Sequence, residues 1–282
     1  MTIVQQLLPA PGGKKTLAGL YLAHALHELG SLSDPFVYGN FLSSLDGRIS
    51  LVDAGTNEPY LPKTLTNAND YRLFLELHAQ CDCLITHGGY LRSMMSGKLG
   101  NILQVGTTSE STEFLDWRTS HGLAPQPAIA IASTSLEFPI PPSIRQHEQP
   151  CYIVTTARAE RQRVLDWEDA GYPVIVVGDG KMVSGQALVE ALRGLGYFRM
   201  YLIAGPHMLD TMIREQQLSR LYQTVSLQLL GGETFHTMIP GIPLGEKGQM
   251  QLRELYYDPG NEDQCAQFFT SFDPIRPSVA GF

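Results

Sequence analysis

The chain has 282 residues, of which 43% are hydrophobic and 17% are charged, and its formal net charge is -8. This composition is ordinary for a globular protein, and the length allows one large domain or two. The negative charge argues against broad, nonspecific binding to nucleic acid or to an anionic membrane surface. No apolar run reaches the ~18 residues of a membrane span, and no secretory signal is visible. We therefore expect a cytoplasmic protein without nucleic-acid or membrane partners.

The four cysteines do not form a metal-binding pattern. Cys81 and Cys83 lie one residue apart in an apolar stretch, and neither Cys151 nor Cys265 belongs to a second pair. Structural zinc sites usually combine two cysteine pairs, or a cysteine pair with a histidine pair. We expect four reduced, mostly buried thiols and no metal site.

The N-terminal part of the chain is predicted to be helical. Leucines recur at helical spacing within residues 16–30, and Gly30 can end the helix. The remainder shows no point at which either half alone would complete a sheet. We therefore expect residues 1–35 to form an N-terminal helical extension and residues 36–282 to form a single domain.

The first strand signal runs directly into a turn. Residues 36–51 are strand-like and contain Asp46-Gly47, and glycine accepts the positive φ that a tight turn needs. Taken alone, this stretch indicates a β-hairpin. Thr66 or Asn67 can cap the helix that follows. A short buried strand over 83–86 and helical turns over 90–96 come next.

The second half of the chain alternates between strand and helix patterns. Such βα units predict a mostly parallel sheet that is covered by helices on both faces. Residues 104–127 are irregular, and the proline-rich residues 139–150 are expected to form a loop. Residues 252–257 are expected to form a last edge strand. The expected strands are 128–132, 151–155, 174–177, 200–203 and 225–230, and the expected helices are 159–170, one after Ser184, and 207–217.

Three glycine-bearing loops follow predicted strands. They are Gly88-Gly89, residues 178–180 and Ala204-Gly205-Pro206. In open α/β sheets, ligands bind outside the carboxyl ends of the strands, where glycine lets the backbone approach a phosphate and the next helix presents free N–H groups. Each loop alone is weak support for a ligand site, since strand-to-helix turns often contain glycine.

A fourth strand end carries hydroxyl groups and a guanidinium group. Thr155, Thr156 and Arg158 suit a phosphate, such as the 2′-phosphate of NADP. The alternative is a helix N-cap at Thr155 or Thr156 with Arg158 in solvent, and the residues alone do not distinguish the two.

The order of these signals resembles the reductase domain of bacterial riboflavin biosynthesis, a branch of the dihydrofolate-reductase-like fold. The resemblance covers roughly residues 36–240, and its most specific parts are Ser44–Arg48 (SLDGR) and the segment ending in Leu-Leu-Gly-Gly. It implies an α/β, three-layer fold with a mostly parallel central sheet, helices on both faces and an antiparallel edge. It further implies a homodimer that uses NADPH to reduce the ribosyl group of 5-amino-6-(5-phosphoribosylamino)uracil. The zinc deaminase signature that often precedes this domain is absent.

The resemblance also implies roles for individual residues. Ser44, Asp46 and Arg48 would bind the substrate, and Asp46 would be catalytic, either by orienting the substrate or by relaying a proton through water. No residue is expected to bind a metal. The residues expected to bind NADPH are Thr86, Gly88, Gly89, Thr155, Thr156, Arg158, Ala204, Gly205, Pro206 and His207.

Several positions depart from the family's pattern. His87 and Tyr90 replace the first glycine and the threonine of Gly-x-Gly-Thr, and Ile203 replaces a glutamate that faces the substrate pocket. The arginines of the strand that maps onto residues 129–137 are missing, which weakens the case for a substrate phosphate. Four cations are candidates to compensate: Lys63, Arg72, Arg92 and Lys98.

Two functions follow from this pattern. The first is an NADPH-dependent reductase that transfers a hydride to an imine or aldehyde carbon of a pyrimidine-like substrate. The second is a catalytically retired, dimeric nucleotide-binding or scaffold protein of the same fold. The missing arginines favour the second, and the intact segment around Asp46 favours the first.

Overall fold

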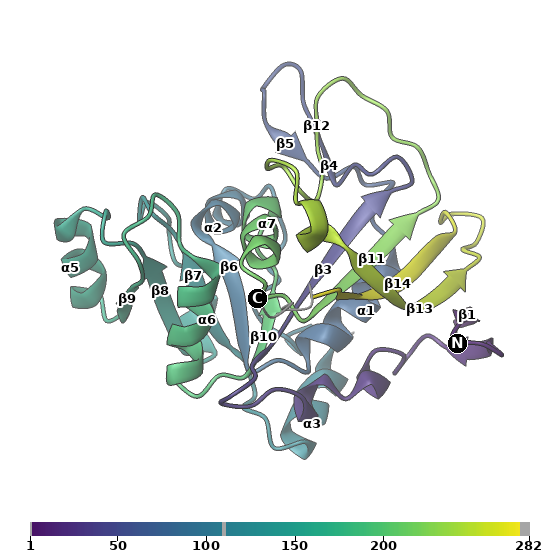
Figure 1. Cartoon of the computed structure of the whole chain (residues 1–282), viewed down its shortest axis with the longest axis horizontal. Helices are drawn as coiled ribbons and strands as arrows, with labels where there is room; N and C mark the ends of the chain where they lie inside the picture. The colour runs from purple at the N-terminus through teal and green to yellow at the C-terminus, as the bar shows by residue number, and fades with distance from the viewer. Residues whose placement is uncertain (1, 109–110, 277–282) are drawn as a thin grey trace, which may run out of the picture.

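A long mixed sheet forms the centre of the protein, for which a computed structural model describes residues 2–108 and 111–276. The sheet has eleven strands in the order β2-β1-β13-β14-β11-β3-β10-β6-β7-β8-β9 (Figure 1). The run from β11 to β9 is parallel, and the remaining pairs are antiparallel. Its strands are β1 (Ile3–Leu8), β2 (Gly13–Thr16), β3 (Phe36–Ser44), β6 (Cys83–His87), β7 (Ala128–Ala132), β8 (Cys151–Thr155), β9 (Val174–Val176), β10 (Arg199–Leu202), β11 (Arg220–Ser226), β13 (Met250–Asp258) and β14 (Gln267–Pro274).

Helices cover both faces of this sheet, as the alternating pattern predicted. Successive strand residues point to opposite faces: Leu84 and Ile129 belong to one core cluster, whereas Ile85 and Ala130 belong to the other. The first cluster includes side chains of α1, α2, α4 and α5, and the second those of α6 and α7. The helices are α1 (Ala68–His78), α2 (Gly88–Met95), α3 (Thr112–Ser120), α4 (Pro142–Gln146), α5 (Arg161–Asp169), α6 (Gly185–Gly194) and α7 (Pro206–Arg214).

A change of direction in the sheet creates a cleft between β6 and β10. From β6 the chain proceeds outward to β7, β8 and β9, and it then returns to β10 and crosses to β11. The loops after β6 and β10 therefore lead away to opposite faces, which is where ligands bind in open α/β sheets. In addition, β10 ends at Leu202, which pairs with Gly39, whereas β3 continues to Ser44 alongside β11. The overhanging end of β3 forms a side wall of the cleft.

A small second sheet lies above this edge (Figure 1). It contains β12 (Phe235–His236), β4 (Ser50–Val52) and β5 (Pro59–Tyr60). The predicted turn at Asp46-Gly47 is confirmed, with a φ of 79° at Gly47. The hairpin is wrong, because β4 pairs with β5 and β12 instead of folding back on β3. This flap, residues 50–60 together with 235–236, covers the outer part of the cleft.

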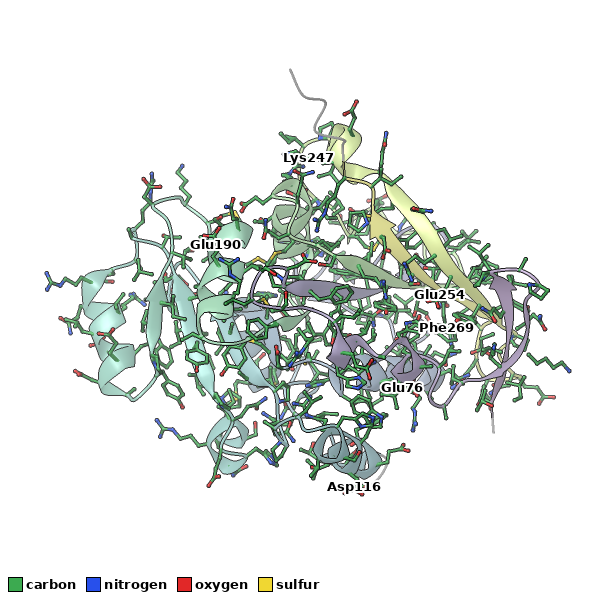
Figure 2. The ribbon with its side chains drawn as sticks, turned by 60° about the horizontal axis from the view of Figure 1, so that its bottom comes forward. Glu76, Asp116, Glu190, Lys247, Glu254 and Phe269 are labelled. Carbon is green, nitrogen blue, oxygen red and sulfur yellow. The ribbon has the colours of Figure 1, made fainter. Side chains whose placement is uncertain are left out.

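The predicted helix over residues 16–30 is wrong. Residues 3–16 form β1 and β2, and β1 pairs with β13. Two short 3-10 helices follow, η1 (Leu22–His24) and η2 (Leu26–Glu28). They are held by α1: the Glu76 carboxylate accepts the N–H groups of Gly19 at 2.6 Å and Tyr21 at 2.8 Å. Figure 2 shows Glu76 beside this segment.

Four other stretches of the chain have a structure that differs from the sequence prediction. The irregular stretch 104–127 contains α3, and the proline-rich loop 139–150 contains the short helix α4. The strand expected over 225–230 begins earlier and ends at Ser226. The strand expected at the edge over 252–257 is internal, between β1 and β14, and β14 itself was missed. A last 3-10 helix, η3 (Gly245–Gly248), precedes β13. No helix among the described residues is long and apolar enough to span a bilayer.

Candidate functional site

Two adjoining pockets occupy the cleft, each with a volume of about 1120 Å³. The inner pocket lies between the end of β3, the first turns of α1, and helix α2. The outer pocket extends under the flap, past the loop after β7. The residues that line both include His87, Gly89, Arg92, Gly205 and Pro206, so the two glycine loops form the boundary between the pockets.

The two glycine loops meet at the side chain of His87. A β-carbon added at Gly205 would lie 3.3 Å from His87 Nε2, and one added at Gly89 would lie 2.8 Å from His87 Nδ1. His87 and Gly205 are the N-cap residues of α2 and α7, and neither gives its helix a side-chain cap hydrogen bond. The first turn of α2 therefore has N–H groups that no side chain caps. In α7, Pro206 has no N–H and the Met208 N–H donates to the Gly205 carbonyl at 3.1 Å, which leaves the His207 N–H to favour an anion.

A cation and a row of hydroxyl groups extend the outer pocket. Arg92 donates to the backbone carbonyl of Glu137 at 2.7 Å, and it has no carboxylate ion-pair partner in the described part of the chain. The loop after β7 brings Ser133, Thr134 and Ser135 into the lining. Their hydroxyl groups and the Arg92 guanidinium can bind phosphate oxygens or ribose hydroxyls. The sequence analysis weighed Arg92 only as a compensating cation and missed the serines.

The inner pocket has one carboxyl group among its lining residues, beside apolar side chains and polar ones such as Asn40, Arg92 and Lys98. Phe41, Phe74 and Ile203 are among its lining residues, together with Asp70 from the first turn of α1. Asp70 Oδ1 is shielded from solvent and has no hydrogen-bond partner within the described residues. Burial raises the pKa of Asp70 to about 6, against the opposing effect of a hydrogen bond with Thr224 of β11. Asp70 can therefore hold a proton near neutral pH and donate it.

The helix that carries Asp70 is fixed at its N-terminus. Asn67 caps α1 by accepting the N–H of Asn69 at 2.7 Å, which confirms one of the two predicted caps. The Asn69 side chain donates to Asp258 at 2.8 Å and so ties the first turn to β13. These contacts place Asp70 against the sheet. The sequence gives a signal for this residue only in its position in the first helical turn after a cap.

Asp46, the residue expected to be catalytic, lies outside the lining of both pockets. Its carboxylate accepts hydrogen bonds from Ser44 Oγ, from the Leu230 N–H at 3.2 Å and from the Gly231 N–H at 2.9 Å. It also pairs with Arg48 at 2.6 Å. The Ser44 and Gly231 hydrogen bonds lower the pKa of Asp46 to about 2. The structure brings Ser44, Asp46 and Arg48 together, but in a turn that joins β3 to residues 230–231.

Only some of the residues expected to bind the cofactor line a pocket. Gly88, Gly89, Ala204, Gly205, Pro206 and His207 all line one or both pockets. Thr86, Thr155 and Thr156 are buried, and neither they nor Arg158 line a pocket. Arg158 donates to the backbone carbonyl of Asp179 at 2.6 Å. Of the four compensating cations, Arg92 and Lys98 line both pockets, whereas Arg72 pairs with Glu76 and Lys63 lines neither.

Comparisons with known proteins agree with this architecture. The chain resembles a solved pyrimidine reductase-like protein from Corynebacterium diphtheriae, with 15% identity, a TM-score of 0.67, and coverage of 93% of this chain and 100% of that one. It also resembles Acinetobacter baumannii RibD, with 17% identity and a TM-score of 0.59 over 86% of this chain and 58% of the other. The riboflavin biosynthesis reductase Rib7 of Saccharomyces cerevisiae gives 14% identity and a TM-score of 0.54 over 90% and 96%.

A search of curated proteins found no match. The sequence model of the family described as the RibD C-terminal domain matches residues 35–259, which is most of the chain. The match confirms the resemblance and the fold class that the sequence predicted, and it leaves the N-terminal strands outside the matched range. The chain belongs to the RibD C-terminal domain family and is an oxidoreductase of the pyrimidine reductase type with a nicotinamide cofactor.

Proposed function

We propose that this protein is an NADPH-dependent reductase of a pyrimidine-like substrate, acting on an imine or open-chain aldehyde carbon such as the ribosyl carbon of 5-amino-6-(5-phosphoribosylamino)uracil. The observation that carries the proposal is the position of Asp70. This protonatable carboxyl group lies in the inner pocket, which shares the two glycine loops with the outer pocket. A proton donor in one pocket and a dinucleotide-sized cleft in the next are the two requirements of such a reduction.

The outer pocket fits the cofactor. The free N–H groups of α2 and α7 and the Arg92 guanidinium suit the phosphates of a dinucleotide. Ser133 and Ser135 suit the additional phosphate of NADPH, in place of the threonines expected from the sequence. With its diphosphate at the boundary between the pockets, a reduced nicotinamide that reached into the inner pocket would supply the hydride.

Asp70 supplies the proton that the reduction requires in addition to the hydride. As the substrate carbon gains the hydride, the nitrogen or oxygen bonded to it gains electron density and takes a proton from Asp70. Burial of Asp70 favours this transfer, because it raises the pKa of Asp70 to about 6 and thereby keeps part of the population protonated near neutrality. The resulting carboxylate regains its proton from solvent after the product leaves.

Asp46 has a positioning role in this proposal. Its hydrogen bonds to the N–H groups of Leu230 and Gly231 join the end of β3 to the loop that precedes β12. Because β12 and β4 form the flap, Asp46 holds the flap over the outer pocket. The homodimer and the cytoplasmic location that the resemblance implies remain predictions.

Thermal unfolding with NADPH, NADP and NADH tests the cofactor. A ligand at 100 times its dissociation constant stabilises a protein by about 2.7 kcal/mol, which moves the midpoint by several degrees. We expect a larger shift with NADPH than with NADH, and oxidation of NADPH with at least one member of a panel of pyrimidines. The absence of a shift with every dinucleotide would contradict the proposal and favour a retired scaffold of the same fold.

A further inference from the structure

His87 occupies a position for which the family resemblance predicts glycine. The residue ends β6 and is the N-cap of α2, and its ring lies between Gly89 and Gly205. A β-carbon at either glycine would be closer to the ring than ordinary van der Waals contact, so both glycines make space for the imidazole. His87 is thus built into the boundary of the two pockets.

The imidazole of His87 has no protein partner that fixes its protonation. Within the described residues it makes no hydrogen bond or ion pair, and neither of its nitrogens is fully shielded from solvent. Both nitrogens are therefore reachable from the cleft. The ring is in this respect unlike His236 on the opposite wall, whose Nδ1 lies 2.9 Å from Ser50 Oγ.

The charged groups around His87 keep it neutral when no anion is bound. Burial, followed by the charges of Arg92 on α2 and His207 on α7, lowers the pKa of His87 to about 4. The other ionisable groups that line the outer pocket are Asp53, Glu58, Lys98 and His236, and Lys98 is paired with Glu58 at 2.6 Å. The Arg92 guanidinium therefore places a positive charge beside the ring, and the N-termini of α2 and α7 add to the positive electrostatic potential there.

An anion bound in this cleft would favour the protonated form of His87 over the neutral form. A diphosphate between the first turns of α2 and α7 would bring negative charge against His87, Arg92 and His207 at once. A nearby negative charge favours the protonated form of histidine, and a protonated ring can donate a hydrogen bond to a phosphate oxygen.

We propose that His87 binds the diphosphate of the dinucleotide and takes up a proton when the dinucleotide binds. This inference rests on the proposed function, because it requires a dinucleotide in the outer pocket. It makes the affinity for the cofactor dependent on pH: affinity falls as pH rises, by up to about tenfold per pH unit over the range in which the bound form is protonated and the free form is not.

Calorimetric titration of NADPH in two buffers with different ionisation enthalpies measures the protons taken up on binding. At about pH 6, we expect the wild-type protein to take up at least about half a proton more than His87→Gln, because only the wild type carries the titrating ring. The 2′-phosphate of NADPH titrates in both titrations and cancels in the difference. His236→Gln, which removes a histidine from the opposite wall, is the matched control and should take up as many protons as the wild type.

The outcomes separate the inference from the proposed function. Equal proton uptake by the wild type and His87→Gln, with NADPH bound to both, would overturn the role of His87 and leave the reductase proposal intact. Absence of NADPH binding to the wild type would overturn both. If His87→Gln does not fold, the His87 ring signal of the wild type can be titrated by NMR with and without NADPH. The inference then requires a pKa that rises by at least about two units when NADPH is bound, because half a proton at pH 6 needs a bound pKa of about 6, and a smaller rise would overturn it.

Discussion

Asp46 Oδ2 accepts a hydrogen bond from the N–H of Gly231 at 2.9 Å, across 185 residues of chain. This contact connects the two parts of the sequence that the family resemblance marks most strongly, SLDGR and Leu-Leu-Gly-Gly. The first ends β3, and the second begins the loop that leads to β12. The two motifs therefore form one structural unit that supports the flap.

Replacing Asp46 by Asn tests this positioning role. Asparagine keeps the size but replaces one acceptor oxygen by an N–H₂ group, which cannot accept from both Leu230 and Gly231. We expect turnover and NADPH affinity each to fall by about tenfold, because the flap that covers the outer pocket is less well positioned. The pH dependence of kcat should keep its shape, since Asp46 does not titrate near neutrality. Loss of an ionisation from that profile would show that Asp46 itself transfers the proton.

Glu233→Gln is the control for this variant. Glu233 is an exposed carboxylate in the loop between Gly231 and β12, and among the described residues it forms no ion pair and lines neither pocket. We expect its turnover to remain within about twofold of the wild type. A loss as large as that of Asp46→Asn would mean that any change of charge near the flap has this effect.

Asp70→Asn changes how stability depends on pH. The folded-state pKa of Asp70, about 6, lies above the 3.8 of an unperturbed aspartate, so the folded protein binds more protons than the unfolded chain between these pH values. The free energy of unfolding of the wild type therefore falls as pH rises from about 4 to 6, by of order 1–3 kcal/mol in total. Asparagine does not titrate, so urea unfolding at both ends of this range should show the variant gaining stability relative to the wild type. A difference in the free energy of unfolding that stays constant across this pH range would contradict a buried carboxyl group with a raised pKa.

Glu76→Gln tests the attachment of the N-terminal segment. The Glu76 side chain is fully buried, accepts the N–H groups of Gly19 and Tyr21, and pairs with Arg72 at 3.0 Å. We expect the free energy of unfolding to fall by about 2–4 kcal/mol, because an amide cannot accept all these bonds and leaves polar groups buried without partners. Glu113→Gln removes the exposed partner of Arg72 and should cost less than about 1 kcal/mol. Equal losses in urea unfolding would contradict the buried anchor.

Gly205→Ala tests the packing of His87 in the cleft. Gly205 has a φ of -69°, which alanine adopts freely, so the cost comes from a β-carbon 3.3 Å from His87 Nε2. We expect NADPH affinity to fall about tenfold as the ring is displaced. Combining Gly205→Ala with His87→Ala should give an affinity no lower than that of His87→Ala alone. Additive losses would show that the two residues do not interact.

The elements governed by local signals were predictable. Asn67 and Ser184 accept N–H groups at the starts of α1 and α6, as their residue types predict. The strands at 128–132 and 151–155 match the apolar runs, because both are buried in the parallel part of the sheet. Local sequence carries such information, since it depends on neighbours within one helical turn or strand.

The elements that depend on contacts with distant parts of the chain could not be predicted from the sequence. The leucines of residues 16–30 have helical spacing, yet the segment forms 3-10 turns because Glu76 and Gln80 of the α1 region bind its backbone N–H groups. Strand β14 depends on pairing with β11 and β13. Asp70 was missed for the same reason: its raised pKa comes from burial, which the sequence does not show.

The measurement that tests the reductase account most directly is the transfer of deuterium from 4,4-dideuterated NADPH to a pyrimidine substrate by the wild type and by Asp70→Asn. We expect deuterium at the reduced carbon of the product, and a wild-type kcat that falls as pH rises above about 6, because only the protonated form of Asp70 donates. Asp70→Asn should bind NADPH normally but lose at least about a hundredfold in kcat. Full turnover by Asp70→Asn, or a product without deuterium, would contradict the account.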